Sequence, residues 1–277
     1  MIFRKRTIPD EEIMTLKEQR SMLGDQLNFA AAEAYKLLRA NLTFSLPDEQ
    51  KCRVVGVTSA VRGEGKSTTS INLAYTLAET GKRVLLVEAD MRRPQLAHRL
   101  AIDAAPGLSN LLAGLCREKD VVQDVGLLEN MKVITSGDVP PNPSELLGSE
   151  RMSTVVETLA QSFDFIIFDL PPVNAVSDGL VVSRFIQGMI VVVRQDYSDR
   201  QGLSAALRQL EYLHIKVLGF VMTHSSISGG RYGRYGRYGR YGRYGQYGRY
   251  ESESRETGAD QERARKTGSA KSRKSKR

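Results

Sequence analysis

The sequence has 277 residues, a formal net charge of +8, 41% hydrophobic residues and two cysteines, Cys52 and Cys116. This length suits one large α/β domain or two small ones, and two cysteines are too few for a disulfide framework. No segment approaches the roughly 20 apolar residues that span a bilayer, and the opening MIFRKRTIPDEE lacks the apolar core of a signal peptide. We therefore expect a cytoplasmic protein that reaches a membrane only through a partner or its basic tail.

The positive charge is confined to the C-terminal end of the chain. From Arg231 onward there are 15 Lys/Arg and 5 Asp/Glu, a local net charge of +10. The first 230 residues carry 25 Lys/Arg and 27 Asp/Glu, a net charge of −2. The body of the protein is therefore nearly neutral, which argues against a general nucleic-acid-binding surface on it.

The N-terminal part of the chain predicts a flexible segment followed by a helix. Residues 1–27 are polar and of mixed charge, and we expect them to be loosely attached. The segment Asn28–Ser45 has helical spacing, because Tyr35, Leu38 and Leu42 fall on one face.

A strand, a glycine-rich loop and a helix come next. The β-branched run RVVGVTSA ends at Ala60, and the helix that begins near Lys66 is stopped by Gly81. The apolar run RVLLVEAD predicts a second strand, from Arg83 to about Glu88.

The remaining elements alternate between strands and helices. The runs MKVITSG, FDFIIFD, QGMIVVVRQ and IKVLGFVMT predict strands. The residues NPSELLGSERMSTVVETLAQSF predict one helix with Ser144 as its N-cap, and RQGLSAALRQLEYL predicts another. This alternation predicts a doubly wound, mostly parallel sheet covered by helices on both faces. We expect one domain over residues 28–225 and a disordered, basic, tyrosine-rich tail over 226–277.

The tail contains a repeat of RYG triplets between Gly229 and Ser252. Its seven tyrosines recur every three residues: Tyr232, Tyr235, Tyr238, Tyr241, Tyr244, Tyr247 and Tyr250. The absence of proline argues against a collagen helix. An RNA-binding tail, a linker and a row of phosphorylation substrates all stay open on the tail alone.

The segment AVRGEGKST lies between a predicted strand and a predicted helix, the context of a phosphate-binding loop. Two glycines let the backbone approach phosphate oxygens, the lysine reaches the β- and γ-phosphates, and the serine hydroxyl binds Mg²⁺. This pattern predicts a P-loop NTPase fold of the MinD/ParA-like type that uses ATP and Mg²⁺. The expected nucleotide-binding residues are Gly63, Glu64, Gly65, Lys66, Ser67 and Thr68.

Three acids follow predicted strands. Asp169 ends the run FIIFD, as a Walker B acid that holds Mg²⁺ does. Glu88 and Asp90 follow the second strand. The carboxyl ends of parallel strands converge on the ligand crevice, so these acids are candidates for the γ-phosphate region, although two solvated loop acids are an equal alternative.

These motifs, in this order and spacing, resemble the bacterial tyrosine kinases. In particular, VEADMRRP, IIFDLPPV and the segment Gly137–Met152 are similar to detached cytoplasmic kinases of the CpsD and CapB type, linked to capsule and exopolysaccharide synthesis. The resemblance covers about residues 28–225. A C-terminal tyrosine cluster is itself a feature of the family, so the resemblance implies autophosphorylation of the seven tail tyrosines.

The resemblance also implies roles for individual residues. Lys66 matches the phosphate-binding lysine, and Ser67, Asp90 and Asp169 match the groups associated with Mg²⁺. Glu88 stands where the family usually has an Asp that is the proposed base for the tyrosine hydroxyl. We expect Glu88, with Asp90 as the reserve, to take the tyrosine proton.

The partners implied by the resemblance are further copies of the chain, a membrane-embedded activator and a cognate tyrosine phosphatase. The segment Glu33–Arg39 resembles the family's oligomerisation helix, with Lys36 in place of an arginine. The family forms rings in which one subunit's tail enters the next. The activator is a membrane protein of the polysaccharide co-polymerase type, which would recruit the kinase to the inner face of the membrane. No specific nucleic acid is expected.

Two alternatives remain at this stage. An ATPase switch of the MinD/ParA type shares the fold, but carries a signature lysine where this chain has Val61 and lacks tyrosine clusters. A nucleic-acid-binding protein could act through the basic tail while the P-loop regulates it.

Overall fold

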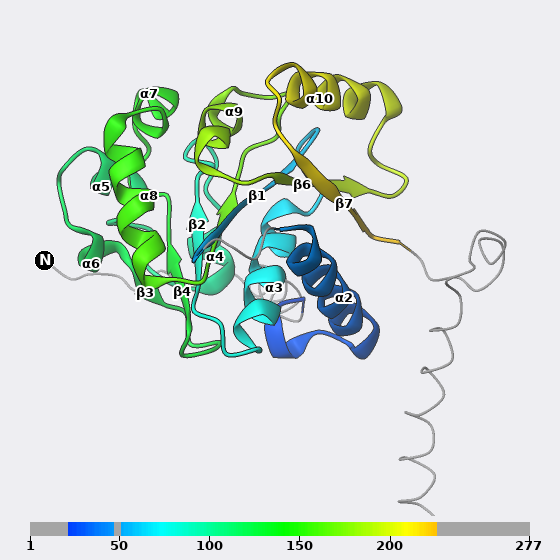
Figure 1. Cartoon of the computed structure of the whole chain (residues 1–277), viewed down its shortest axis with the longest axis horizontal. Helices are drawn as coiled ribbons and strands as arrows, with labels where there is room; N and C mark the ends of the chain where they lie inside the picture. The colour runs from blue at the N-terminus through cyan, green and yellow to red at the C-terminus, as the bar shows by residue number, and fades with distance from the viewer. Residues whose placement is uncertain (1–21, 47–50, 226–277) are drawn as a thin grey trace, which may run out of the picture. The chain divides into compact units, whose positions relative to one another are not determined.

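A computed structural model describes residues 22–46 and 51–225 (Figure 1). Its centre is a seven-stranded sheet in the order β3-β4-β2-β5-β1-β6-β7. The strands are β1 (Arg53–Ser59), β2 (Val84–Glu88), β3 (Gln123–Asp124), β4 (Met131–Ile134), β5 (Phe165–Asp169), β6 (Met189–Arg194) and β7 (Val217–Thr223). All neighbouring strands run parallel except the edge pair β3 and β4. The predicted doubly wound, mostly parallel sheet is confirmed.

Helices cover both faces of this sheet. On one face lie a short 3-10 turn η1 (Gly24–Gln26) and the helices α2 (Phe29–Ser45), α3 (Lys66–Ala78) and α4 (Leu96–Leu100). On the other lie α5 (Leu108–Leu112), α6 (Glu118–Val121), α7 (Pro143–Leu147), α8 (Glu150–Ser162), α9 (Asp178–Val182), the 3-10 turn η2 (Ser183–Phe185) and α10 (Arg200–Tyr212). Both faces of the central strands are therefore buried, as their continuous apolar runs require.

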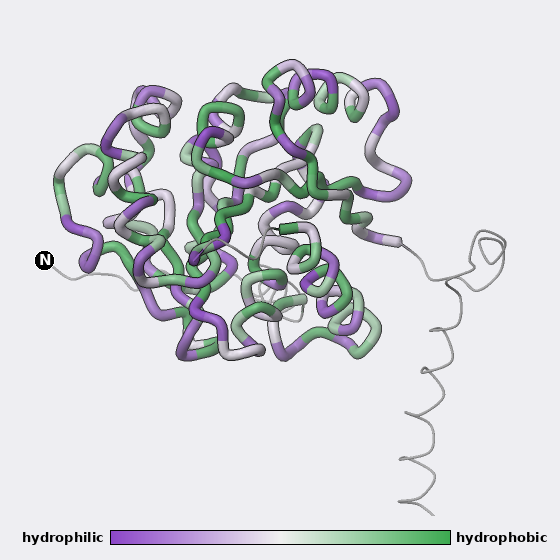
Figure 2. The backbone as a smooth tube through the Cα atoms, viewed as in Figure 1, coloured by the Kyte–Doolittle hydropathy of each residue, from purple (hydrophilic) through white to green (hydrophobic). Residues whose placement is uncertain are grey.

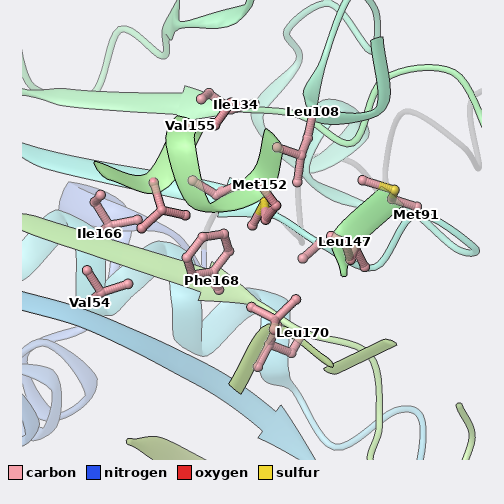
Figure 3. Packing of buried hydrophobic residues seen from close by; sticks show 14 of the residues in the cluster. Val54, Met91, Leu108, Ile134, Leu147, Met152, Val155, Ile166, Phe168 and Leu170 are labelled. Atoms are coloured by element: carbon pink, nitrogen blue, oxygen red, sulfur yellow. The ribbon is translucent and has the colours of Figure 1, made fainter. Parts of the chain in front are cut away.

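Each face has its own apolar core, and alternate residues of a strand enter different cores. In β2, Leu85 and Val87 join the cluster under α5–α10, whereas Val84 and Leu86 join the one under α2–α4. Figure 3 shows part of the first cluster, where Phe168 of β5 packs among side chains from α7 and α8. Figure 2 shows the hydrophobic segments gathered in the central strands. By the same alternation, Glu88 and Asp169 continue the α3 and α4 face.

The predicted helix from 142 to 163 is wrong in one respect, because the chain forms two helices there. α7 ends at Leu147 with Gly148 as its C-cap, and the side chain of Ser149 caps α8 by accepting a hydrogen bond from Met152 N. Ser144 is not an N-cap. It lies inside α7, and its hydroxyl donates to the carboxylate of Asp178.

The N-terminal helix is confirmed, and the residues just before it are held in place. Asn28 caps α2 by accepting from Ala31 N at 2.9 Å. Leu23 is buried, and Gly24 N donates to Asn72 Oδ1 of α3 at 2.9 Å. Residues 1–21 and the predicted tail over 226–277 lie outside the described residues.

Candidate active site

The phosphate-binding loop joins β1 to α3 at the carboxyl edge of the sheet. Gly63 and Gly65 have φ angles of +78° and +96°, a region that L side chains rarely adopt. A Cβ at Gly65 would lie 3.2 Å from Thr223 Cγ2, and one at Gly63 would lie 3.1 Å from the Tyr197 hydroxyl. Glycine is therefore required at both positions. The first backbone N–H groups of a helix have no partner within the helix, so those at the start of α3 can bind an anion.

Lys66, Ser67, Asp90 and Asp169 converge at the start of α3. Lys66 Nζ lies 3.5 Å from Asp90 Oδ2, and both side chains are nearly buried. The Ser67 hydroxyl lies close enough to the Asp169 carboxylate to lower its pKa, and Ser70 Oγ donates to Asp169 Oδ1 at 3.2 Å. The fold thus brings together the residues that the sequence assigns to phosphate and Mg²⁺.

The electrostatics of Asp169 are set by its burial and by its charged and hydroxyl neighbours. Asp169 is 1% exposed, and burial raises the pKa of its carboxyl. The charge of Lys66 and the Ser67 and Ser70 hydroxyls oppose that shift, while the negative charge of Asp90 adds to it. A bound divalent cation would favour the ionised form of this carboxylate much more strongly.

Asp90 pairs with Lys66, whereas the Glu88 carboxylate accepts hydrogen bonds from backbone amides. Glu88 is 1% exposed and lies in register with Asp169 on the neighbouring strand. Its Oε1 accepts hydrogen bonds from Gln95 N and from Leu96 N, the latter at 2.7 Å, and its Oε2 accepts from Ser136 N at 3.1 Å. Burial raises the pKa of Glu88, and these three amides oppose the shift. The prediction that Glu88 takes a tyrosine proton stays a prediction.

The phosphate-binding loop is braced by residues that the sequence analysis missed. The Glu64 side chain is fully buried and accepts from Val61 N at 2.8 Å and from the Ser198 hydroxyl. The Glu64 carbonyl accepts from Thr223 Oγ1 at 2.7 Å. Glu64, expected to bind nucleotide, thus also ties its loop to β7 and to the segment after β6.

Three arginines surround this centre, and only Arg92 lies in a motif that the sequence marks, VEADMRRP. Arg194 donates to Gly63 O at 3.1 Å, and its guanidinium lies 4.8 Å from the centre of the Tyr197 ring. Arg99 of α4 donates to Thr68 Oγ1 at 3.2 Å. Burial lowers the pKa of Arg99, and the charges of Asp169 and Glu88 oppose that shift.

The third arginine, Arg92, holds the loop that carries Asp90. It donates to both carboxylate oxygens of Asp178, at 2.7 and 3.1 Å. Asp178 is fully buried at the start of α9 and also accepts from Ser144. The segment Gly137–Met152, noticed only as a family feature, therefore helps to fix the active-site loop.

The residues present fit Mg²⁺ bound together with a nucleotide. Among residues 22–46 and 51–225, no group of three or more His, Cys, Asp or Glu is placed to hold a metal alone. Mg²⁺ commonly takes one or two protein groups together with phosphate oxygens and waters. Ser67 with Asp169 and Asp90 supplies such a partial set.

The remaining predictions from the sequence concern α2, the tail tyrosines and membrane-spanning helices. On α2, Glu33 pairs with Lys36 at 2.8 Å on the surface, whereas Arg39 donates to Thr76 O of α3 at 2.6 Å. The seven tail tyrosines lie outside the described residues. In the described part of the chain, no helix is both long and apolar enough to cross a membrane.

Comparisons with known proteins place this domain in a family. An AAA-domain family model matches residues 52–218. The tyrosine-protein kinase YwqD of Bacillus subtilis is 34% identical over 197 residues, which cover 71% of this chain and 82% of that protein. The tyrosine-protein kinase CpsD of Streptococcus pneumoniae serotype 4 is 35% identical over 203 residues, covering 73% and 88%.

Solved structures agree with these relatives. The chimerical protein CapA2B2 superimposes with a TM-score of 0.69 at 31% identity, covering 74% of this chain and 89% of that one. The kinase domain of Escherichia coli tyrosine kinase ETK gives 0.68 at 30% identity, covering 83% and 87%. MinD of Pyrococcus horikoshii, with Mg-ADP, gives 0.52 at 24% identity, which shows the shared fold alone. The chain belongs to the bacterial protein-tyrosine kinases.

Proposed function

We propose that the chain transfers the γ-phosphoryl group of ATP to the tyrosines of its own C-terminal tail, mainly between copies of the chain. The observation that carries this proposal is the place where the tail begins. Thr223, the last residue of β7, binds the phosphate-binding loop through the Glu64 carbonyl. Tyr232 follows Thr223 by only nine residues, so a short stretch of chain separates the first acceptor tyrosine from a residue that contacts the phosphate-binding loop.

The reach of the tail allows delivery to its own site or to a neighbour's. A glycine-rich coil spans about 5–6 Å times the square root of its residue number. On that basis Tyr232 would lie roughly 15 Å from Ser225 on average, and Tyr250 roughly 28 Å. The arginines between the tyrosines would be attracted to a site that contains Glu88, Asp90 and Asp169.

The reaction forms a bond between the tyrosine oxygen and the γ-phosphorus, and breaks the bond from that phosphorus to the β,γ-bridging oxygen. ADP leaves with that oxygen, and the phenolic proton passes to a carboxylate of the pair Glu88 and Asp90. Lys66 and the amides at the start of α3 hold the phosphates in line and offset their charge. Mg²⁺, held by Ser67, Asp169 and Asp90, would neutralise charge on the β- and γ-oxygens.

Oligomerisation and an activator complete the proposal. Phe29, Leu37 and Phe44 of α2 are 69%, 62% and 88% exposed, which gives this helix an apolar surface for another copy. We infer a ring in which one copy's tail reaches the next copy's site. The family resemblance also supports activation by the cytoplasmic end of a membrane co-polymerase, reversal by a tyrosine phosphatase, and a role in capsular or exopolysaccharide synthesis and export.

Phosphorylation would also change how the tail interacts. Each phosphotyrosine adds about −1.5 to −2 charges, so seven would add roughly −10 to −14. The tail would change from a net charge of +10 to about neutral or slightly negative. An acidic neighbouring site would then bind it less well, and the ring would loosen.

The direct test is mass spectrometry of the purified chain after incubation with Mg-ATP, alone and with an activator segment. We expect phosphate on the tail tyrosines, at a low level without the activator and at a higher level with it. The matched control is ADP in place of ATP. Absence of phosphotyrosine under both conditions, in protein that binds Mg-ATP, would contradict the proposed function and favour an ATPase switch.

A further inference from the structure

Glu88 stands at the position that the family resemblance assigns to the proton acceptor, yet its carboxylate is already occupied. Three backbone amides donate to it, from Gln95, Leu96 and Ser136. The side chain is 1% exposed, whereas Asp90 is 8% exposed. With three donors on its two oxygens and almost no exposed surface, this carboxylate has no open face from which a substrate hydroxyl could approach it.

Two of these hydrogen bonds close the loop that carries Asp90. Gln95 and Leu96 form the entrance of α4, seven and eight residues after Glu88. The residues between, from Ala89 to Pro94, therefore form a loop whose two ends are joined by one side chain. Asp90 is the second residue of that loop, and its Oδ1 accepts from Arg93 N at 3.2 Å.

Other contacts fix this loop to the rest of the site. Ala89 N donates to the Asp169 carbonyl at 2.9 Å, which fixes the backbone beside Asp90 to the backbone of Asp169. Arg92 binds the buried Asp178. The third bond of Glu88, from Ser136 N, ties the end of β2 to the segment after β4.

We propose that Glu88 is a positioning residue, which holds Asp90 toward Lys66 and the Mg²⁺ position through the amides of Gln95, Leu96 and Ser136, and does not take the tyrosine proton. This inference rests on the proposed kinase reaction, and it removes Glu88 from the two candidate proton acceptors in it. The longer side chain of Glu, where relatives of the family usually have Asp, reaches amides of two separate segments. The effect of Glu88 on catalysis is therefore exerted through Asp90.

The test is an equilibrium titration of the full chain with ADP, with Mg²⁺ and separately with EDTA. The variants are Glu88→Gln, which keeps the size but loses one acceptor, and Glu88→Asp, which keeps the charge but shortens the reach. Glu129→Gln, at an exposed position, is the matched control. Groups that orient a metal ligand typically change metal affinity by about 10- to 100-fold. We expect the Kd of Mg-ADP to rise by about that factor in Glu88→Gln, and the Kd of ADP in EDTA to change less than about threefold.

A double-mutant comparison sharpens the test. Glu88→Gln should add little to the loss of Mg²⁺-dependent affinity that Asp90→Asn already causes, because both act through the same carboxylate. Where circular dichroism shows that Glu88→Gln does not fold, Glu88→Asp serves in the same titration. The proposal is overturned if both folded variants bind Mg-ADP as the wild type does while tail phosphorylation falls by about 10²- to 10⁴-fold, the behaviour of a lost general base. Equal losses with Mg²⁺ and with EDTA would also overturn it, since they indicate a general structural defect.

These outcomes separate this inference from the proposed function. Without any tail phosphorylation by the wild type the kinase proposal fails, but the Mg²⁺ dependence of ADP binding still reports whether Glu88 positions Asp90. With phosphorylation present and Mg-ADP affinity unchanged in the variants, only the inference about Glu88 fails.

Discussion

Replacing Lys66 with methionine removes the positive charge that forms an ion pair with Asp90. The Nζ to Oδ2 distance is 3.5 Å, and the two side chains are 12% and 11% exposed. At an effective dielectric constant of about 20, the direct attraction is about 5 kcal/mol, and desolvation of both charges offsets most of it. We expect the unfolding free energy of the nucleotide-free protein to fall by about 1–3 kcal/mol, because Asp90 keeps its burial but loses its cation.

The effect on catalysis should be much larger than the effect on stability. Loss of a group that stabilises charge in the transition state typically lowers the rate by about 10²- to 10³-fold. The assays are anti-phosphotyrosine detection after incubation with Mg-ATP and thermal unfolding followed by circular dichroism. Lys132→Met is the matched control, because Lys132 pairs with Asp124 at the far edge of the sheet. A Lys66→Met chain that phosphorylates its tail at the wild-type rate would refute this account of the site.

The strands and the phosphate-binding loop could be predicted from the sequence because their signals are local. The run FIIFD is fully buried on both faces, so it is apolar throughout, and Asp169 stands out at its end. The break between α7 and α8 was missed because the apolar periodicity continues across Gly148. A serine that caps a helix and one inside a helix look alike in the sequence, and Ser149 was the cap.

The contacts that shape the active site could not be predicted, because their partners are distant along the chain. Ser198 and Thr223 bind Glu64 across 134 and 159 residues. The amides around Glu88 come partly from a segment 48 residues away. Every residue except proline carries a backbone N–H, so residue types do not show which of these groups donates to a given side chain. The sequence therefore identified Glu88 as an acid without showing that its oxygens accept hydrogen bonds.

Two further measurements test the packing at the amino-terminal ends of β1 and β5, at the opposite edge of the sheet from the active site. A hydrogen bond from Arg83 lowers the pKa of Asp164, so its stabilisation is present above the ordinary value of about 3.9 and is lost as the pH falls through the lower folded value. Asp164→Asn should therefore lower the unfolding free energy by about 0.5–1 kcal/mol at pH 7. When unfolding is measured at a series of lower pH values, this difference should disappear at the most acidic ones. A difference that stays the same at every pH would contradict this. Burial raises the pKa of Cys52 to about 11, so iodoacetamide at pH 8 should label Cys116 well before Cys52, and equal labelling of the native protein would contradict the packing.

The most direct test of the central claim is transfer between two chains that cannot modify their own tails. A Lys66→Met chain with its tail intact is mixed with an active chain truncated after Gly230, and the tyrosines are examined by mass spectrometry. The account predicts phosphate on Tyr232–Tyr250 of the Lys66→Met chain, at a lower level when the helix around Glu33–Arg39 is disrupted, because the neighbour's effective concentration falls. Unmodified tail tyrosines, in a preparation whose intact wild type is active, would contradict transfer between copies.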